Sequence, residues 1–218
     1  MPPEKKRMME LSLEEGRLLI RLARKAVEKY LREEAYEKPP ANLKDVFYEP
    51  CGVFVTLNRL TGPAGMGRKE LRGCIGFPEP VKPLVDALIE AAVAAAVEDP
   101  RFPPVTLEEM SLIIIDVSVL TPPKLLEVKD RRMLPKEVKI GRDGLIVERG
   151  FNRGLLLPQV AVEEKWGPET FLSYTCIKAG LPAGFWLDEK TRVYSFQAIV
   201  FEETFPNGEV KKVELGYP

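Results

Sequence analysis

The first apolar pattern along the chain repeats at helical spacing. Ser12 and Glu15 have the spacing of a capping box, in which each side chain binds the backbone N–H of the other residue, and the apolar residues that follow predict an amphipathic helix to about residue 34. The opposite side of this helix carries charged residues, Arg24 among them, and we expect that face to be solvated. The apolar side should therefore cover part of the core.

Two further segments predict helices. Residues 84–98 are apolar nearly all round and rich in alanine, a pattern typical of a helix buried among close-packed neighbours. After Pro168, apolar residues that include Phe171 and Cys176 share one helical face, so we expect Cys176 to lie in the core. The alanine-rich segment is the candidate for the central helix of the fold.

Alternation of apolar and polar residues predicts strands elsewhere in the chain. The expected strands are residues 53–58, 71–77, 112–120, 155–160 and 193–201. Between residues 138 and 148, the sequence Arg142-Asp143-Gly144 is typical of a tight turn between two short strands. The middle of the chain is therefore expected to be β-rich.

The composition is that of a globular protein without a strong overall field. Hydrophobic residues make up 45% and charged residues 30%, and 32 basic against 33 acidic residues give a net charge of -1, which would not draw the chain to nucleic acid or to a membrane. Many charged residues and prolines, with few glutamines and asparagines, are typical of a protein from a heat-loving organism. The N-terminal residues lack the apolar stretch of a signal peptide, and no segment reaches membrane-spanning length, so we expect a cytoplasmic protein.

The chain contains no histidine. A Ser-His-Asp or Cys-His pair, a zincin helix and a facial-triad iron site each need an imidazole, so this chain alone can build none of them. The glycine-rich phosphate loop, the dinucleotide-binding fingerprint and the nucleophile elbow are also missing from the sequence. Acid–base chemistry would therefore fall to Asp, Glu, Lys, Tyr or Cys, and the sequence identifies no cofactor.

The three cysteines are widely spaced and include no CxxC pair. This spacing argues against a structural zinc site and against a disulfide framework, and we expect no metal site. A single bridge between Cys51 and Cys176 stays open at this point, because proteins of hyperthermophiles tolerate cytosolic disulfides.

The most distinctive chemistry lies in the strand expected at residues 71–77. Period-two alternation places Arg72 and Cys74 on one face, roughly 6.5 to 7 Å apart at Cα, where the guanidinium can lower the pKa of the thiol. Gly73 and Gly76 weaken a strand, so they indicate a bulge, a close backbone approach or room for a ligand. The residues alone favour a simpler interpretation, in which Cys74 is a small buried residue and the glycines make room for the alanine-rich helix.

The sequence Leu71-Arg72-Gly73-Cys74-Ile75-Gly76 resembles the signature of the AMME chromosomal-region family, named for Alport syndrome, intellectual disability, midface hypoplasia and elliptocytosis. Four more blocks follow the family pattern in the same order, at residues 52–56, 99–104, 118–121 and 157–160. The resemblance, which covers nearly the whole chain, implies a two-lobed α+β fold with an antiparallel or mixed sheet and a cleft between the lobes. The implied larger lobe comprises residues 1–122 and 168–190, and the smaller, β-rich lobe comprises residues 123–167 and 191–218.

The resemblance implies a region of interest but no established reaction. In many prokaryotes, similar proteins are encoded beside, or fused to, a Memo-like domain and a radical-SAM enzyme, which makes these proteins candidate partners in a shared pathway. We hypothesise an enzyme or enzyme component in which Arg72 binds an anionic group and Cys74 is a nucleophile or thiol carrier. The residues expected to form the binding region around them are Gly73, Ile75, Gly76, Asp99, Arg101, Phe102 and Gln159.

Two alternative functions stay open from the sequence. The chain could be a module that recruits a protein partner through a groove lined by Phe102, the neighbouring prolines and Trp166. It could also bind nucleic acid through a local basic patch that contains Arg149 and Arg153, although the balanced net charge fits this alternative poorly.

Overall fold

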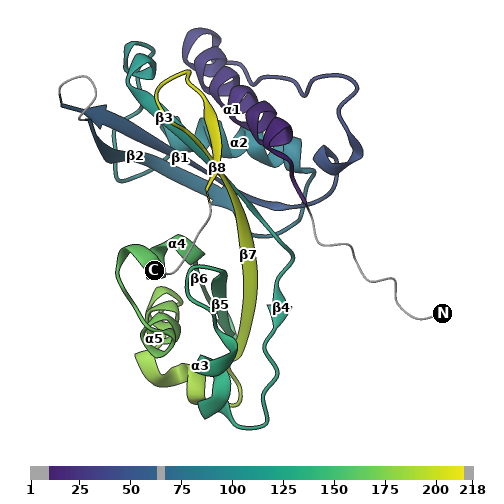
Figure 1. The fold of residues 1–218 in the computed structure, drawn as a ribbon, viewed down its shortest axis with the longest axis vertical. Coiled ribbons are helices and arrows are strands. Elements are labelled where there is room, and N and C mark those ends of the chain that lie inside the picture. Colours follow the sequence, from purple (N-terminus) through teal and green to yellow (C-terminus); the bar gives the residue numbers. More distant parts are fainter. Residues whose placement is uncertain (1–9, 63–66, 214–218) are drawn as a thin grey trace. The chain divides into compact units, whose positions relative to one another are not determined.

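The computed structural model describes residues 10–62 and 67–213, so the N-terminal residues on which the signal-peptide argument rests lie outside the described part. The protein has an α+β fold, as expected, and divides into two compact units (Figure 1). Of the described residues, the first unit comprises 10–62, 67–119 and 199–213, and the second comprises 120–198. In the described ranges, no helix combines the length and the apolar character that crossing a bilayer requires.

Helix α1 (Leu13–Glu33) begins the first unit where the capping box predicts it. The Ser12 backbone N–H donates to the Glu15 carboxylate at 2.7 Å, and the Glu15 backbone N–H donates to Ser12 Oγ at 3.3 Å. The expectation of a fully solvated charged face is wrong at Arg24, which is 5% exposed. Its guanidinium donates to the Glu203 carboxylate at 3.0 Å through Nε, and to two backbone carbonyls, and these acceptors compensate for burying the charge.

The sheet of the first unit contains β2 (Arg68–Phe77), β1 (Gly52–Thr61) and β3 (Ile113–Leu120) in that spatial order. The end of β7 (Arg192–Glu203) and β8 (Val210–Val213) form an antiparallel pair in the same unit. Helix α2 (Leu84–Val97) packs on β1 and β2, and α1 packs on α2, so both helices cover one face of the sheet (Figure 1). The predicted central helix is therefore confirmed.

The second unit is built around β5 (Asp143–Arg149), which pairs with β6 (Asn152–Leu156) and with the first part of β7. A short strand, β4 (Lys124–Leu125), also pairs with β7. The α-helices of this unit are α3 (Leu134–Glu137), α4 (Pro158–Glu163) and α5 (Pro168–Lys178). Short 3-10 helices occur in both units, at Asp45–Phe47 and Glu108–Ser111 in the first and at Arg131–Met133 and Ala183–Leu187 in the second.

The segment 168–190, which we expected in the larger lobe, belongs to the second unit. Phe171, Leu172 and Cys176 on α5 are buried in one apolar cluster with Leu145 and Val147 of β5. The helical face predicted from the sequence is correct, but apolar periodicity does not specify the sheet against which that face packs.

Two expected strands differ from the structure. The strand expected at residues 155–160 ends at Leu156, because Pro158 starts α4, where its missing N–H carries no cost. No strand forms at residues 138–142. The Asp143 carboxylate instead accepts the Lys139 backbone N–H at 2.9 Å and closes a local turn, and the hairpin turn falls between β5 and β6 at Gly150.

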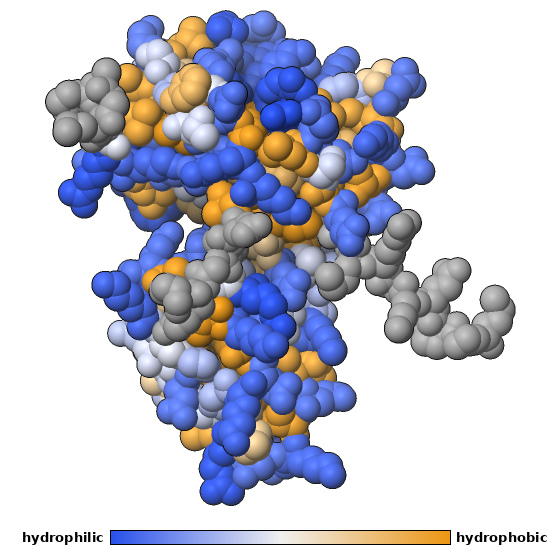
Figure 2. Space-filling model, viewed as in Figure 1, coloured by the Kyte–Doolittle hydropathy of each residue, from blue (hydrophilic) through white to orange (hydrophobic). Residues whose placement is uncertain are grey.

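No disulfide joins Cys51 to Cys176. Cys51 lies in the apolar core of the first unit and Cys176 lies in that of the second. Hydrophilic side chains occupy much of the visible surface of each unit, with apolar residues between them (Figure 2). The view agrees with the interspersed charges of the sequence.

Candidate functional site

Strand β2 is the outer strand of its sheet among the described strands, so one side of its backbone pairs with none of them. At Cys74, two side chains from the segment after α2 take the place of a strand. The Cys74 backbone N–H donates to the Asp99 carboxylate at 2.8 Å, and the Arg101 guanidinium donates to the Cys74 carbonyl at 3.4 Å. Two blocks of the family pattern thus bind each other and close the edge of the sheet.

Asp99 is held as a carboxylate by this arrangement. Hydrogen bonds from Arg101, and from the backbone N–H groups of Arg101 and Cys74, keep the pKa of Asp99 well below its ordinary value despite its burial. The ion pair with Arg101 measures 2.6 Å, and the Arg101 side chain remains 53% exposed. Arg101 is therefore the partly exposed cation next to Cys74.

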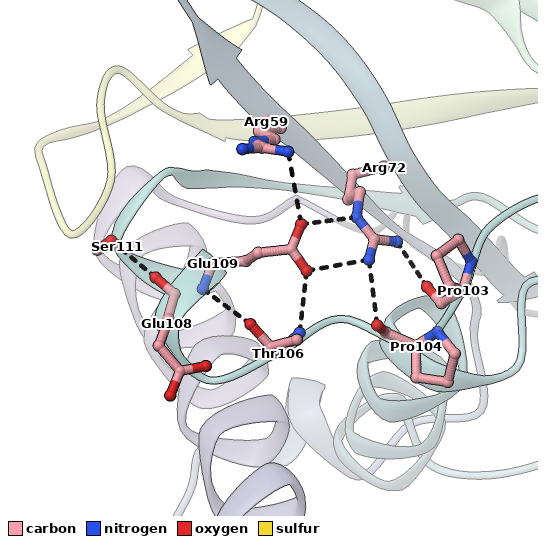
Figure 3. A network of polar contacts seen from close by, with 8 residues as sticks. All are labelled: Arg59, Arg72, Pro103, Pro104, Thr106, Glu108, Glu109 and Ser111. Atoms are coloured by element: carbon pink, nitrogen blue, oxygen red, sulfur yellow. Dashed lines mark hydrogen bonds and ion pairs between the residues drawn. The ribbon is translucent and has the colours of Figure 1, made fainter.

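The Arg72 side chain forms its hydrogen bonds with residues of the segment 103–109, as Figure 3 shows. Its guanidinium donates to both oxygens of the Glu109 carboxylate at 3.1 Å, and to the carbonyls of Pro103 and Pro104 at 2.8 and 3.2 Å. The Arg72 side chain is only 11% exposed. These contacts connect β2 to the loop that carries Asp99 and Arg101.

The expectation that Arg72 and Cys74 project side by side is wrong. The pairing of β1 with β2 shifts register between Leu57 and Asn58, so that Gly73 pairs with Leu57, Leu71 pairs with Asn58, and Arg72 is the additional residue. Such a bulge interrupts the alternation of faces on which the expectation rested. The charged groups that shift the pKa of the Cys74 thiol are accordingly Arg101, Asp99 and Asp116, and not Arg72.

The two signature glycines lie where a side chain would collide with the protein. A Cβ at position 73 would be 2.0 Å from the Ala95 carbonyl oxygen of α2, and one at position 76 would be 2.4 Å from the Val53 carbonyl oxygen and from the Phe54 ring. The predicted close approach of the alanine-rich helix is therefore confirmed at Gly73.

The Cys74 thiol is half-buried on the face of the sheet opposite α2. Cys74 pairs with Thr56 in the register of β1 and β2, and the Thr56 hydroxyl donates to Sγ at 3.2 Å. Burial raises the pKa of the thiol, and the nearby carboxylates of Asp99 and Asp116 add to the rise, although Thr56 and Arg101 oppose it. The expectation of a lowered pKa is wrong, so the thiol is protonated at neutral pH.

The same face carries a polar pair that the sequence did not identify as functional. The Asn58 side-chain amide donates to Asp116 Oδ2 at 2.7 Å, whereas Asp116 Oδ1 is buried and has no hydrogen-bond partner among the described residues. Burial raises the pKa of Asp116 to about 7, and the charges of Glu202 and Glu203 contribute, while Lys69 and Asn58 oppose the rise. The available signal was the lone charged residue within the Ile113–Leu120 strand, whose other residues are apolar except for Ser118.

The remaining expected site residues lie in different surroundings. Ile75 packs against the core of the first unit, and Phe102 is half-buried with the Arg101 guanidinium 5.5 Å from its ring centre. Gln159 lies on α4 of the second unit, and its Oε1 is buried without a hydrogen-bond partner in the described part of the chain. The structure thus brings Cys74 together with Asp99 and Arg101.

Three of the residues proposed for the alternative functions, Trp166, Arg149 and Arg153, form contacts within the second unit. Trp166 stacks on Tyr174 with the ring centres 4.1 Å apart. Arg149 pairs with Asp188 at 3.1 Å, and Arg153 pairs with Glu148 at 3.3 Å. Because Arg153 pairs with Glu148 and Glu148 and Arg149 are successive residues of a strand, alternation places Arg149 and Arg153 on opposite faces of the hairpin.

Among the described residues, no group of three or more His, Cys, Asp or Glu side chains is arranged to hold a metal ion. The polar groups that could contact a ligand near Cys74 are the thiol, the Thr56 hydroxyl, the Asn58–Asp116 pair and the exposed part of Arg101.

Comparison with known proteins identifies relatives along nearly the whole chain. The family model AMMECR1 matches residues 20–201. A protein of Pyrococcus furiosus is 55% identical over 95% of this chain and 97% of its own length, and a protein of Thermofilum pendens is 54% identical over 93% of this chain and 96% of its own length. The crystal structure of an uncharacterised protein from Pyrococcus horikoshii superimposes with a TM-score of 0.87 at 52% identity, and covers 94% of this chain and all of that one. The relatives are thermophilic archaeal proteins, in agreement with the composition.

Proposed function

This chain belongs to the AMMECR1 family, and from that premise we propose that it is an enzyme, or a component of one, whose reaction takes place at the Cys74 thiol. The observation that carries this proposal is the sharing of one sheet face by Cys74, Thr56 and the Asn58–Asp116 pair. A nucleophile needs a neighbouring group that can move its proton, and this face supplies a thiol and a carboxyl together.

The other residues of the signature support the thiol from the edge of the strand. Asp99 and Arg101 hold the backbone of Cys74, and Arg72 ties their loop to β2. We assign to Arg101, which is partly exposed, the anion-binding role that the sequence suggested for Arg72. We assign a shaping role around Cys74 to the remaining residues, which are Phe102, Ile75, Gly73 and Gly76.

The pathway proposed for this enzyme also contains the Memo-like and radical-SAM proteins, and the family resemblance supports that association. Recruitment of partners without catalysis has less support, because Trp166 is stacked on Tyr174 and Phe102 is half-buried beside Arg101. Nucleic-acid binding has less support still, because Arg149 and Arg153 are each paired with a carboxylate.

The test is turnover of a compound from a small-molecule extract of Pyrococcus furiosus cells, since a close relative occurs there. We expect mass spectrometry to show that wild-type protein consumes at least one compound in molar excess over itself, and that C74A does not. The matched control is C176A, which removes a buried thiol from the core of the second unit and should leave turnover intact. An extract left unchanged by the wild-type protein, or changed equally by C74A, would contradict the proposal.

A further inference from the structure

The first unit contains a cavity of about 400 Å³ between α2 and the segment that follows α1. Its six lining residues are Tyr36, Glu37 and Pro39 from that segment, and Asp86, Ile89 and Glu90 from α2. A cavity of this volume lies within the range of sites that hold small molecules. None of the groups around Cys74 lines it, so it is a separate candidate for a binding site.

One part of the cavity wall is apolar and is held in place. The rings of Tyr36 and of Tyr30 on α1 meet edge to face with their centres 5.4 Å apart, which limits the movement of Tyr36. Tyr36 is nevertheless 47% exposed, so a ligand can cover it. Ile89 and Pro39 add apolar surface from α2 and from the segment after α1. This wall therefore favours a ligand with an apolar body.

Two of the three carboxylates of the cavity are already paired with lysines. Glu37 contacts the ammonium groups of Lys25 and Lys29 on α1, at 3.4 and 3.8 Å. Glu90 contacts the ammonium group of Lys82 at 2.5 Å. Because the lysines balance these two charges, Glu37 and Glu90 have little attraction left for a cationic ligand.

Asp86, the third carboxylate, has no partner of this kind. Its side chain is half-buried and forms neither a hydrogen bond nor an ion pair with any residue in the described part of the chain. An ammonium group that enters the cavity can therefore pair with Asp86 without displacing another partner. Burial raises the pKa of Tyr36 and the charge of Glu98 adds to the rise, in agreement with a negative potential at this wall.

The class of ligand follows from this combination of groups. A divalent metal ion prefers several oxygen ligands at once, whereas Glu37 and Glu90 are held by lysines, so a bare metal ion fits the cavity poorly. One unpaired carboxylate beside an aromatic ring instead suits an ammonium group that is attached to an apolar body.

We propose that this cavity binds a small organic amine. The ammonium group of the amine pairs with Asp86, and its apolar body lies against Tyr36, Pro39 and Ile89. The inference does not rest on the reaction proposed for Cys74, because no residue of that site contributes to the cavity.

The experiment titrates isotopically labelled full-length protein with phenethylamine at pH 7 and follows the backbone signals by NMR. This amine joins an ammonium group to an aromatic body. We expect saturable shifts at Asp86, Ile89 and Glu90, with a dissociation constant of about 1 mM or lower. Shifts that do not saturate, or that map to other parts of the chain, would contradict binding in the cavity.

Two further ligands separate the charge from the apolar body. Phenethyl alcohol carries a hydroxyl in place of the ammonium group, and methylammonium lacks the ring, so we expect each to bind roughly tenfold more weakly than phenethylamine. Equal affinity for the alcohol overturns the pairing with Asp86, and equal affinity for methylammonium overturns the role of the apolar wall. These comparisons use the wild-type protein and do not depend on the folding of a variant.

A matched pair of variants tests Asp86. D86N should bind phenethylamine roughly fivefold more weakly, because the amide carries no charge. D45N removes an exposed carboxylate of the same unit that does not line the cavity, and it should bind as wild type does. An unchanged affinity in D86N, or an equal loss in D45N, overturns the role of Asp86.

A second pair tests the aromatic wall. Y36F keeps the ring and should retain the affinity for phenethylamine, whereas Y36A removes it and should lose roughly threefold. Equal affinities in the two variants contradict the contact between the ring and the ligand. Thermal unfolding of both variants shows whether they are folded at the temperature of the titration.

A lysine side chain of another protein would present the same ammonium group as a free amine. The titration therefore includes N-acetyl-lysine methylamide, in which the backbone is blocked as it is within a chain. Tighter binding of this compound than of phenethylamine overturns the assignment to a small free amine. C74A should bind phenethylamine as wild type does, so the cavity and the reaction at Cys74 are tested separately.

Discussion

The edge and the face of β2 differ in how their charges are matched. Along the edge, Asp99 is paired with Arg101, and Glu109 is paired with Arg72, through hydrogen bonds of 2.6 to 3.1 Å. On the face, the Asp116 carboxyl has a neutral partner, the Asn58 amide, and an oxygen without a partner among the described residues. Matched charges stabilise one geometry, whereas an unmatched carboxyl can change its protonation state. The edge of the strand is therefore suited to holding the structure, and the face to chemistry.

The largest expected effect is a loss of stability at Gly73, where the edge strand β2 touches α2. We expect G73A to destabilise the protein by about 3 kcal/mol, because the added Cβ would be 2.0 Å from a backbone oxygen that cannot move without shifting α2. Thermal and urea unfolding measure the loss. The control is G184A, since a Cβ at position 184 meets nothing within 4 Å, and an equal loss in both variants would contradict the close-approach argument.

Removing the edge charge at Asp99 should have the next largest effect. We expect D99N to lose about 2 kcal/mol at pH 7, because it breaks charge-assisted hydrogen bonds to Arg101 and to the Cys74 backbone. Because the pKa of Asp99 is lowered in the folded protein, its contribution is present above the unfolded pKa and is lost as pH falls through the folded value. The difference between wild type and D99N should shrink in unfolding experiments below pH 4, and a difference independent of pH would be contrary evidence.

A smaller effect is expected at Arg72. Lysine cannot reproduce the four hydrogen bonds of the guanidinium, so R72K should cost about 1 kcal/mol in urea unfolding and leave the alkylation rate of Cys74 unchanged. Arg59 contacts the same carboxylate at 3.8 Å with a side chain that is 45% exposed, and R59A should therefore cost less than about 0.5 kcal/mol. A lower alkylation rate of Cys74 in R72K would instead support the pairing of Arg72 with Cys74 that the structure contradicts.

Local pattern was sufficient to predict much of the scaffold. The capping box at Ser12 and the uniform apolar character of α2 are properties of short sequence windows, and both predictions are confirmed. The close approach at Gly73 was also predictable, because a glycine inside a strand often marks a place where another backbone comes near.

The arrangement of the site was not predictable, because it depends on pairing between distant segments. The signature glycines indicated a bulge as one possibility, but the place of the bulge at Arg72 is a property of the register between β1 and β2, which a single strand does not contain. The partner of Asp116 is likewise set by the neighbouring position of β3 and β1 in the sheet. Arg24 was misplaced for the same reason, since its acceptor Glu203 is far away in the sequence.

The last expected effect, no larger than that of R72K, concerns Asp116 on the face of the sheet and has the opposite sign to the effect at the edge. The pKa of Asp116 is raised from 3.8 to about 7 in the folded protein, so between these values the folded state binds more protons than the unfolded state. The free energy of unfolding contributed by this residue therefore falls as pH rises from about 4 to about 7. A shift of this size corresponds to at most about 4 kcal/mol, and water that enters as the carboxyl ionises reduces it, so we expect about 1 kcal/mol.

D116N removes this penalty because the amide stays neutral. We expect D116N to be more stable than wild type in urea unfolding at pH 8 and equally stable at pH 4, whereas D99N should be less stable than wild type at pH 8 and approach it in acid. Since both variants replace a carboxylate by an amide, the opposite signs can come only from the surroundings of the two residues. If D116N were instead destabilised at pH 8, the Asp116 carboxylate would stabilise the fold as Asp99 does. The face and the edge of β2 would then not differ in the effect of their carboxylates on stability.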